Sequence, residues 1–271
     1  MRKRIIIAVL ALFLLATAAI SAQPADLVGI AHVAFRVAHL EKSVQFYEAL
    51  GFEKAFEFAE ADKVTEEFIK VNDRQFIELY PRTQESQSLG LMHVCFEASD
   101  IEAVRRRYAK LGLNPSEVKK FRAGDLLFVL HDPNGQLVEF TQYWPGSLHA
   151  EDRGKHLGSR RASDHLRAAS TPVKDVDAAR VFYVDKLGFT DSGSTPTSLR
   201  LPGNSGDELE LQLAATSTKS QIGFAVGDVK QTADLLRKRG LTPRMEHGAV
   251  MVNDPDRTLI VFGDTSSTQK P

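Results

Sequence analysis

The chain has 271 residues, enough for two ordinary domains, and its 43% hydrophobic and 25% charged residues are typical of a packed globular protein. A fibrous or disordered chain is therefore excluded. The 34 basic and 35 acidic residues nearly cancel, so no chain-wide charge attracts a phosphate backbone. We expect no nucleic-acid partner.

The N-terminal segment departs from this balance. A basic cluster at 2–4 precedes an unbroken apolar run over 5–20, and the small residues Ser21 and Ala22 follow it. This pattern predicts a signal peptide over 1–22 and an exported protein, periplasmic or secreted. The run is short for a membrane span, and the alternative is an uncleaved N-terminal anchor. We expect no other membrane contact.

An internal repeat organises the first half of the chain. The segment 29–35, GIAHVAF, recurs 61 residues later as GLMHVCF. The same displacement relates His32 to His93 and Glu78 to Glu139. Chance would rarely place two histidines and two glutamates in matching pairs at one period, so this repeat is the main indication of a site.

Each repeat unit has the pattern strand, helix and then three strands. Apolar residues at helical spacing predict helices over 41–52 and 101–113, each with a glycine at its exit. In the second unit, apolar segments at 126–130 and 137–143 flank the turn sequence DPNG at 132–135. The expected unit is βαβββ, and the fold class is α+β.

The second half repeats this scheme more faintly, since FYVDKLGF at 182–189 echoes FYEALGF at 46–52. Four units make two domains, each a mixed curved sheet that forms a cleft with its helices packed outside. The expected boundaries are a metal-binding domain at 27–145, a solvated Gly- and Ser-rich linker at 146–163, a degenerate second domain at 164–264 and a flexible tail at 265–271.

Strand alternation places the four repeated residues on one side of the sheet. His32 lies opposite Val33 and Phe35, which form an apolar face for the helices. If the two units curve around a common cleft, the imidazoles and carboxylates converge there. A divalent ion, Zn, Ni, Co, Mn or Fe, would offset the cost of burying two carboxylates. The alternative is four half-exposed residues on a solvated sheet face.

Together these features resemble the vicinal oxygen chelate superfamily, which includes glyoxalases, bleomycin resistance proteins and extradiol dioxygenases. Residues 27–144 are most similar to the glyoxalase I branch. The motifs that carry the resemblance are HVAFRV at 32–37, HVCFEA at 93–98, FYEALGF at 46–52, FIELY at 76–80, and DPNG at 132–135 followed by Glu139.

The resemblance implies a site and a reaction on a small-molecule substrate. The oligomeric state that we expect is a monomer or a homodimer. The implied metal ligands are His32, Glu78, His93 and Glu139. The ion would polarise a carbonyl, a glutamate would remove the proton from the neighbouring carbon, and the metal would hold the enediolate until the proton returns. Glu139 is the chosen base, with Glu78 as its pseudosymmetric alternative.

Two arginines match substrate positions of the family. Arg36 lies where glyoxalase I enzymes often bind a substrate carboxylate, and Arg122 lies where they have a mobile basic loop. A solvated strand end and a charged surface turn are the alternatives.

Two features depart from a lactoylglutathione lyase. Export separates the protein from cytosolic glutathione, and the second domain offers His165, Glu210, Gln221 and Val261 as counterparts of the ligands. A valine cannot bind metal, so we expect the second domain to shape a pocket or to be vestigial.

Two other functions remain open at this stage. An extradiol-type dioxygenase needs only His32, His93 and Glu139, and a sequestering protein would use the cleft without catalysis. The remaining histidines, His39, His131, His149, His156 and His247, are expected at the surface, and Cys95 is expected to line the cleft as a packing residue.

Overall fold

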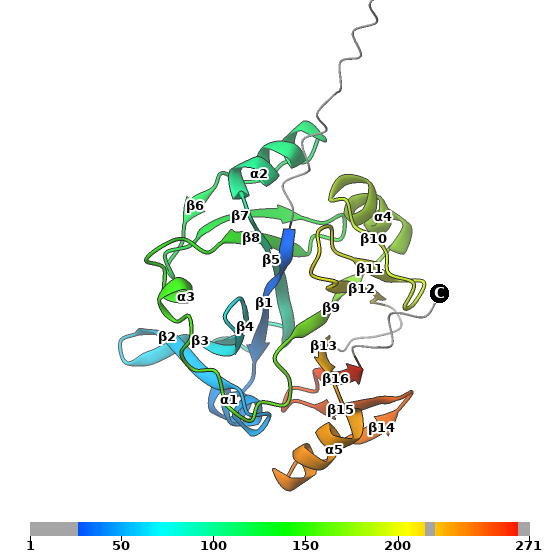
Figure 1. Cartoon of the computed structure of the whole chain (residues 1–271). Helices are drawn as coiled ribbons and strands as arrows, with labels where there is room; N and C mark the ends of the chain where they lie inside the picture. Colours follow the sequence, from blue (N-terminus) through cyan, green and yellow to red (C-terminus); the bar gives the residue numbers. More distant parts are fainter. Residues whose placement is uncertain (1–26, 215–219, 265–271) are drawn as a thin grey trace, which may run out of the picture.

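The computed structural model describes residues 27–214 and 220–264, so the predicted signal peptide and tail lie outside the described residues. The chain forms two eight-stranded mixed sheets (Figure 1). Their orders are β2-β3-β4-β1-β5-β8-β7-β6 and β10-β11-β12-β9-β13-β16-β15-β14. Within the described ranges, no helix combines the length and apolar character needed to cross a bilayer.

The first sheet contains two βαβββ units, as the repeat predicts. Its elements are β1 Leu27–Val37, α1 Leu40–Ala49, β2 Glu53–Glu60, β3 Lys63–Asn72, β4 Gln75–Pro81, β5 Gly90–Ala98, α2 Ile101–Lys110, β6 Lys119–Lys120, β7 Leu126–His131 and β8 Leu137–Gln142. Both helices are followed by a glycine with positive φ, Gly51 at 88° and Gly112 at 81°, which ends the helix without a Cβ clash.

The second sheet repeats the arrangement with shorter strands. Its elements are β9 Leu166–Val173, α4 Val176–Arg180 continued by the π-helix η1 Val181–Lys186, β10 Thr190–Asp191, β11 Ser198–Arg200, β12 Glu208–Leu213, β13 Gln221–Val226, α5 Val229–Lys238, β14 Arg244–Glu246, β15 Ala249–Asn253 and β16 Leu259–Asp264. The α+β class and the pairing of units into two domains are confirmed.

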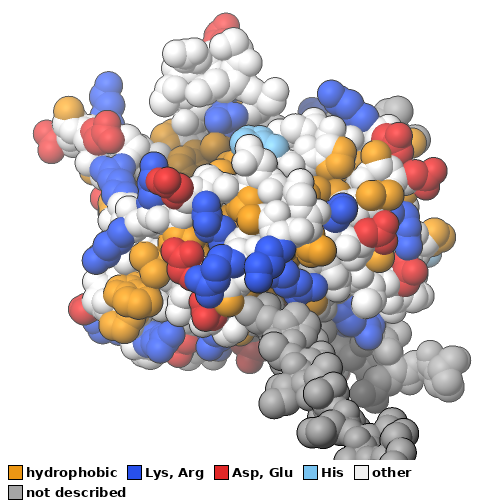
Figure 2. Space-filling model, turned by 90° about the horizontal axis from the view of Figure 1, so that it is seen from above, with side chains coloured by type: hydrophobic (Ala, Val, Ile, Leu, Met, Phe, Trp, Pro, Cys, Tyr) orange, Lys and Arg blue, Asp and Glu red, His pale blue; other side chains and the backbone are white. Residues whose placement is uncertain are grey.

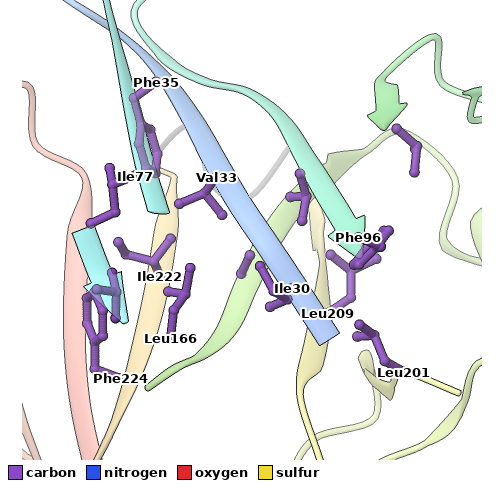
Figure 3. Packing of buried hydrophobic residues seen from close by; sticks show 14 of the residues in the cluster. Ile30, Val33, Phe35, Ile77, Phe96, Leu166, Leu201, Leu209, Ile222 and Phe224 are labelled. Carbon is purple, nitrogen blue, oxygen red and sulfur yellow. The ribbon is translucent and has the colours of Figure 1, made fainter. Parts of the chain in front are cut away.

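The apolar faces of the two sheets share one core. Val33 on β1 belongs to the same buried cluster as Leu166 on β9 and Ile222 on β13, and Figure 3 shows these side chains between the strands. Two helices cannot cover eight strands, so the remaining apolar surface of each sheet packs against the other domain. The sequence predicted only helices on this face.

Specific polar contacts also join the domains. The Asp207 carboxylate accepts a hydrogen bond from the backbone N–H of Ile30 at 2.8 Å and lies 2.7 Å from Nε2 of His165. The Gln75 side chain exchanges two 2.8 Å hydrogen bonds with the backbone of Leu166. Because these groups are buried or half-buried, the contacts fix how the sheets sit together.

The outer surface mixes charges, as the near-neutral composition predicts. In the view from above, Lys and Arg side chains gather near the middle of the face with Asp and Glu around them (Figure 2). This face carries α2, on which Glu102, Arg106 and Lys110 are exposed.

The segment between the domains differs from the expected solvated linker. It contains a short helix, α3 Leu148–Glu151, and its Ser147, His149 and Asp152 are buried. The Gly and Ser content favoured a solvated segment, but His149 and Asp152 are buried because they contact Asp125 and Lys70 of the first domain.

Candidate metal centre

Four adjacent central strands supply the four repeated residues. His32 lies on β1, Glu78 on β4, His93 on β5 and Glu139 on β8, and these strands are neighbours in the order β4-β1-β5-β8. The curvature of the sheet brings the four side chains to one place, as strand alternation predicts.

Three donor atoms form a nearly equilateral triangle. Nε2 of His32 lies 3.2 Å from Nε2 of His93, and Oε2 of Glu139 lies 3.5 Å and 3.4 Å from these two nitrogens. A point equidistant from the corners of such a triangle lies about 2 Å from each, which is the usual bond length from a divalent ion to imidazole or carboxylate. The donor set therefore fits a metal ion.

Glu78 borders this triangle. Its Oε2 lies 3.8 Å from Nε2 of His93, and its Oε1 lies 3.1 Å from Nδ1 of His32. The latter contact lacks the alignment of a hydrogen bond, and Nδ1 has no other partner among the described residues. A buried nitrogen of this kind is rare in a folded protein.

Burial sets the protonation of the site. It lowers the pKa of His32 to about 3 and that of His93 to about 4, so both imidazoles are neutral near pH 7. Burial raises the pKa of Glu139, and it raises that of Glu78 well above the ordinary value. Neutral imidazoles are ready ligands, and a nearby cation would favour the ionised carboxylates.

Sequence reasoning missed a phenol beside the site. The Tyr80 hydroxyl donates to Oε1 of Glu66 at 2.5 Å and lies 3.2 Å from Oε2 of Glu78. Tyr80 follows Glu78 by two residues on the same strand, so alternation could have indicated it. Glu66 lies on β3 and carried no signal.

Cys95 lines the site, as expected. Its sulfur and one ligand atom each of His32 and Glu139 lie within 4.8 Å of one another. The side chain is buried, and burial raises the pKa of the thiol. A protonated buried thiol is a packing group rather than a nucleophile.

Among the described residues, the two predicted substrate arginines contact groups other than the four candidate ligands. Arg36 is half-buried on β1 and donates to the carbonyl of Ser88 at 3.3 Å. Arg122 reaches the β2–β3 hairpin, where its guanidinium lies 4.3 Å from the ring centre of Phe58 and Nη1 lies 3.2 Å from Oγ1 of Thr65. Arg122 therefore links the two edges of the curved sheet.

The expected surface position of His149 is wrong. The residue is 4% exposed, and its Nδ1 lies 2.5 Å from Oδ2 of the equally buried Asp125. Its α3 helix packs against the first sheet, which no local pattern in the linker indicated. The other four of these histidines are exposed, as expected.

The second domain needs one correction. Val33 pairs with Ile77 and Val94, and Ala169 pairs with Leu209 and Ile222, so these two residues are equivalent. The counterpart of His32 is therefore Ala168, not His165.

The other three counterparts are placed as predicted. By the same register, Glu210 corresponds to Glu78, Gln221 to His93 and Val261 to Glu139. The Glu210 carboxylate accepts hydrogen bonds from Thr195 and Thr197. With alanine and valine at two of the four positions, the second domain lacks the ligand set.

Comparison with known proteins agrees with this architecture. The family model for the Glyoxalase/Bleomycin resistance protein/Dioxygenase superfamily matches residues 29–140 and 163–262. Because the match covers most of the chain, the protein belongs to this vicinal oxygen chelate superfamily. Among curated proteins, none matches the sequence.

Solved structures share the fold at low sequence identity. The 2,3-dioxygenase LapB from Pseudomonas sp. KL28 is 14% identical, with a TM-score of 0.67, covering 89% of this chain and 93% of that one. A Mn(II)-bound glyoxalase from Novosphingobium aromaticivorans is 15% identical, with a TM-score of 0.66, covering 88% and 82%. An extradiol ring-cleaving dioxygenase from B. fuscum is 19% identical, with a TM-score of 0.63, covering 89% and 73%.

Proposed function

We propose that the first domain binds one divalent metal ion through His32, Glu78, His93 and Glu139 and uses it in catalysis. The observation that supports this most directly is the triangle of donor atoms with sides of 3.2, 3.4 and 3.5 Å. Zn, Ni, Co, Mn and Fe all suit two imidazoles and two carboxylates.

The proposed reaction is proton transfer next to a carbonyl in a small molecule, of the lyase or isomerase type. A bound ion would supply Lewis acidity to polarise that carbonyl. Glu139 is the proposed base, because its side chain is 14% exposed against 5% for Glu78. Tyr80 holds Glu78 in place, whereas the described residues offer Glu139 only the two imidazoles as polar contacts. A base must reach the substrate, and Glu139 is the freer carboxylate.

Arg36 and Arg122 are proposed as substrate-binding residues at the rim of this cleft. Arg36 is the better placed of the two, because the only polar contact of its guanidinium within the described ranges is one of 3.3 Å to the Ser88 carbonyl. A carboxylate on the substrate would be its natural partner. Residues 1–22 further support export of the protein, which N-terminal sequencing of the mature chain would test.

A second candidate reaction is extradiol-type ring cleavage at an iron centre. Oε1 of Glu78 lies beside Nδ1 of His32, where a carboxylate commonly orients a ligating imidazole. Glu78 would then not bind the ion, and the ligands would be His32, His93 and Glu139. Two histidines and one carboxylate are the set found in non-haem iron oxygenases.

Elemental analysis of purified protein tests the metal site. The wild type and a control His131→Ala, whose imidazole is exposed, should each hold one ion per chain, while His93→Ala and Glu139→Gln should lose it. Full stoichiometry in both site variants would overturn the proposal. Solvent deuterium appearing at carbon in the product would support proton transfer, and oxygen uptake with catechols by the iron-loaded protein would instead support ring cleavage.

A further inference from the structure

The helix α3 lies against the same face of the first sheet as the candidate metal centre. The imidazole of His149 stacks on the ring of Tyr143, with centroids 4.7 Å apart. Three further rings surround this imidazole in T-shaped contacts, with ring centroids 4.6–5.4 Å from its own: Phe56, Phe68 and Phe76. Phe76 pairs with His32 across β4 and β1, so this aromatic cluster borders the site.

Two buried polar anchors hold α3 on the sheet. Asp125, in the loop before β7, binds Nδ1 of His149 at 2.5 Å. Lys70 on β3 donates to Oδ2 of Asp152, just after α3, at 2.7 Å. The helix therefore bridges the two edges of the curved sheet, between β6 and the β2–β3 hairpin (Figure 1).

The two ends of the site differ in exposure. On the side of α3, Phe76 and Cys95 are 0% exposed and Phe68 is 2% exposed. On the other side, Arg36 and Tyr80 are half-buried. Along the strands, one end of the site is closed and the other is accessible.

We propose that α3 is the end wall of the metal cleft and that the His149 ring determines how far a ligand can extend past the ion toward Cys95. This inference rests on the proposed function, because it requires ligands to bind at the ion. The wall comes from the segment that tethers the second domain, so the connection between the domains also sets ligand size. The ring has one hydrogen bond, at Nδ1, and its Nε2 has no partner among the described residues.

The test removes the imidazole ring of His149 and measures whether other molecules bind in the space that it leaves. In His149→Gly, free imidazole should bind the metal-free protein and raise its melting temperature, but it should not do so in wild type. His247→Gly is the matched control, because His247 is an exposed histidine in the turn between β14 and β15, away from the α3 anchors, and its φ of 50° suits glycine.

Metal-loaded proteins are then titrated with two chelating probes, acetohydroxamate and benzohydroxamate. The preference for the phenyl-bearing probe should increase about tenfold in His149→Gly, because the phenyl group can enter the vacated ring space, and it should not change in His247→Gly. His149→Asn retains a donor for Asp125, so it provides the same comparison if the glycine variant does not fold.

The outcomes separate the two proposals. Stoichiometric metal binding with an unchanged probe preference in both His149 variants would overturn the end wall and leave the proposed function intact. A wild type that binds no metal would overturn both.

Discussion

Nε2 of His32 lies 3.2 Å from Nε2 of His93, although the two residues are not paired in the sheet. His32 pairs with Cys95, and His93 pairs with Ala34, so the imidazoles meet diagonally across two antiparallel strands. With pKa values lowered to about 3 and about 4, both rings are neutral at pH 7. Two neutral rings can share one hydrogen bond, or both nitrogens can face a common cation.

Metal binding should therefore stabilise the folded protein. At a free ion concentration one hundred times Kd, linkage adds about 2.7 kcal/mol to the free energy of unfolding. Calorimetry should show a rise in Tm on adding the ion and its reversal by a chelator. His93→Ala should show neither change, and an equal rise in that variant would place the ion elsewhere.

The His165–Asp207 contact predicts a pH dependence of stability. The hydrogen bond to Asp207 raises the pKa of His165, so the protonated ring is favoured in the folded state. The contribution of this contact to the free energy of unfolding is complete below the pKa of the unfolded state, about 6.5. It is lost as the pH rises through the higher pKa that His165 has in the folded state.

Urea unfolding of wild type and His165→Gln measures this contribution. The difference between the two proteins should be larger at pH 5.5 than at pH 8.5. A difference that stays constant or grows with pH would contradict the assignment. Because the ring is about a third exposed, solvent screening keeps the effect small.

Lys70 should be important for stability, because its side chain is 0% exposed and binds Asp152 at 2.7 Å and Asp73 at 2.9 Å. Lys70→Met leaves the buried Asp152 carboxylate without its cation and should cost about 3–5 kcal/mol in urea unfolding. Lys63→Met, at an exposed position of the same strand, is the control and should change stability by less than about 0.5 kcal/mol. Adding Asp152→Asn to Lys70→Met should recover part of the loss.

The sequence predicted that these four side chains come together, because a repeat and strand alternation are local signals. His32 and His93 begin matching motifs, and parity alone orients Glu78 and Glu139. The Asp125–His149 contact has no such signal, because burial of a linker residue depends on where the whole sheet curves. The sequence could not indicate Glu66 for the same reason, since Glu66 is connected to the site by its hydrogen bond from the Tyr80 hydroxyl.

The error at His165 has a different origin. The helix motif Phe46-Tyr47 recurs at Phe182-Tyr183, a displacement of 136 residues, and the same displacement carries His32 to Ala168. His165 lies three residues before Ala168. A shift of one or three residues along a strand assigns a residue to the opposite face of the sheet. The residue predicted to face the site is then a different one.

The corrected register makes a gain of function testable. Ala168→His, Gln221→His and Val261→Glu, combined with the native Glu210, reproduce the four proposed ligands of the first domain at equivalent positions of the second sheet. Elemental analysis of this triple variant should give two ions per chain instead of one.

The matched control carries only Gln221→His and Val261→Glu and retains the native His165 and Ala168. If Ala168 is the true counterpart of His32, the control stays at one ion, because His165 lies three residues away and is bound to Asp207. Two ions in the control would instead favour His165 as the counterpart.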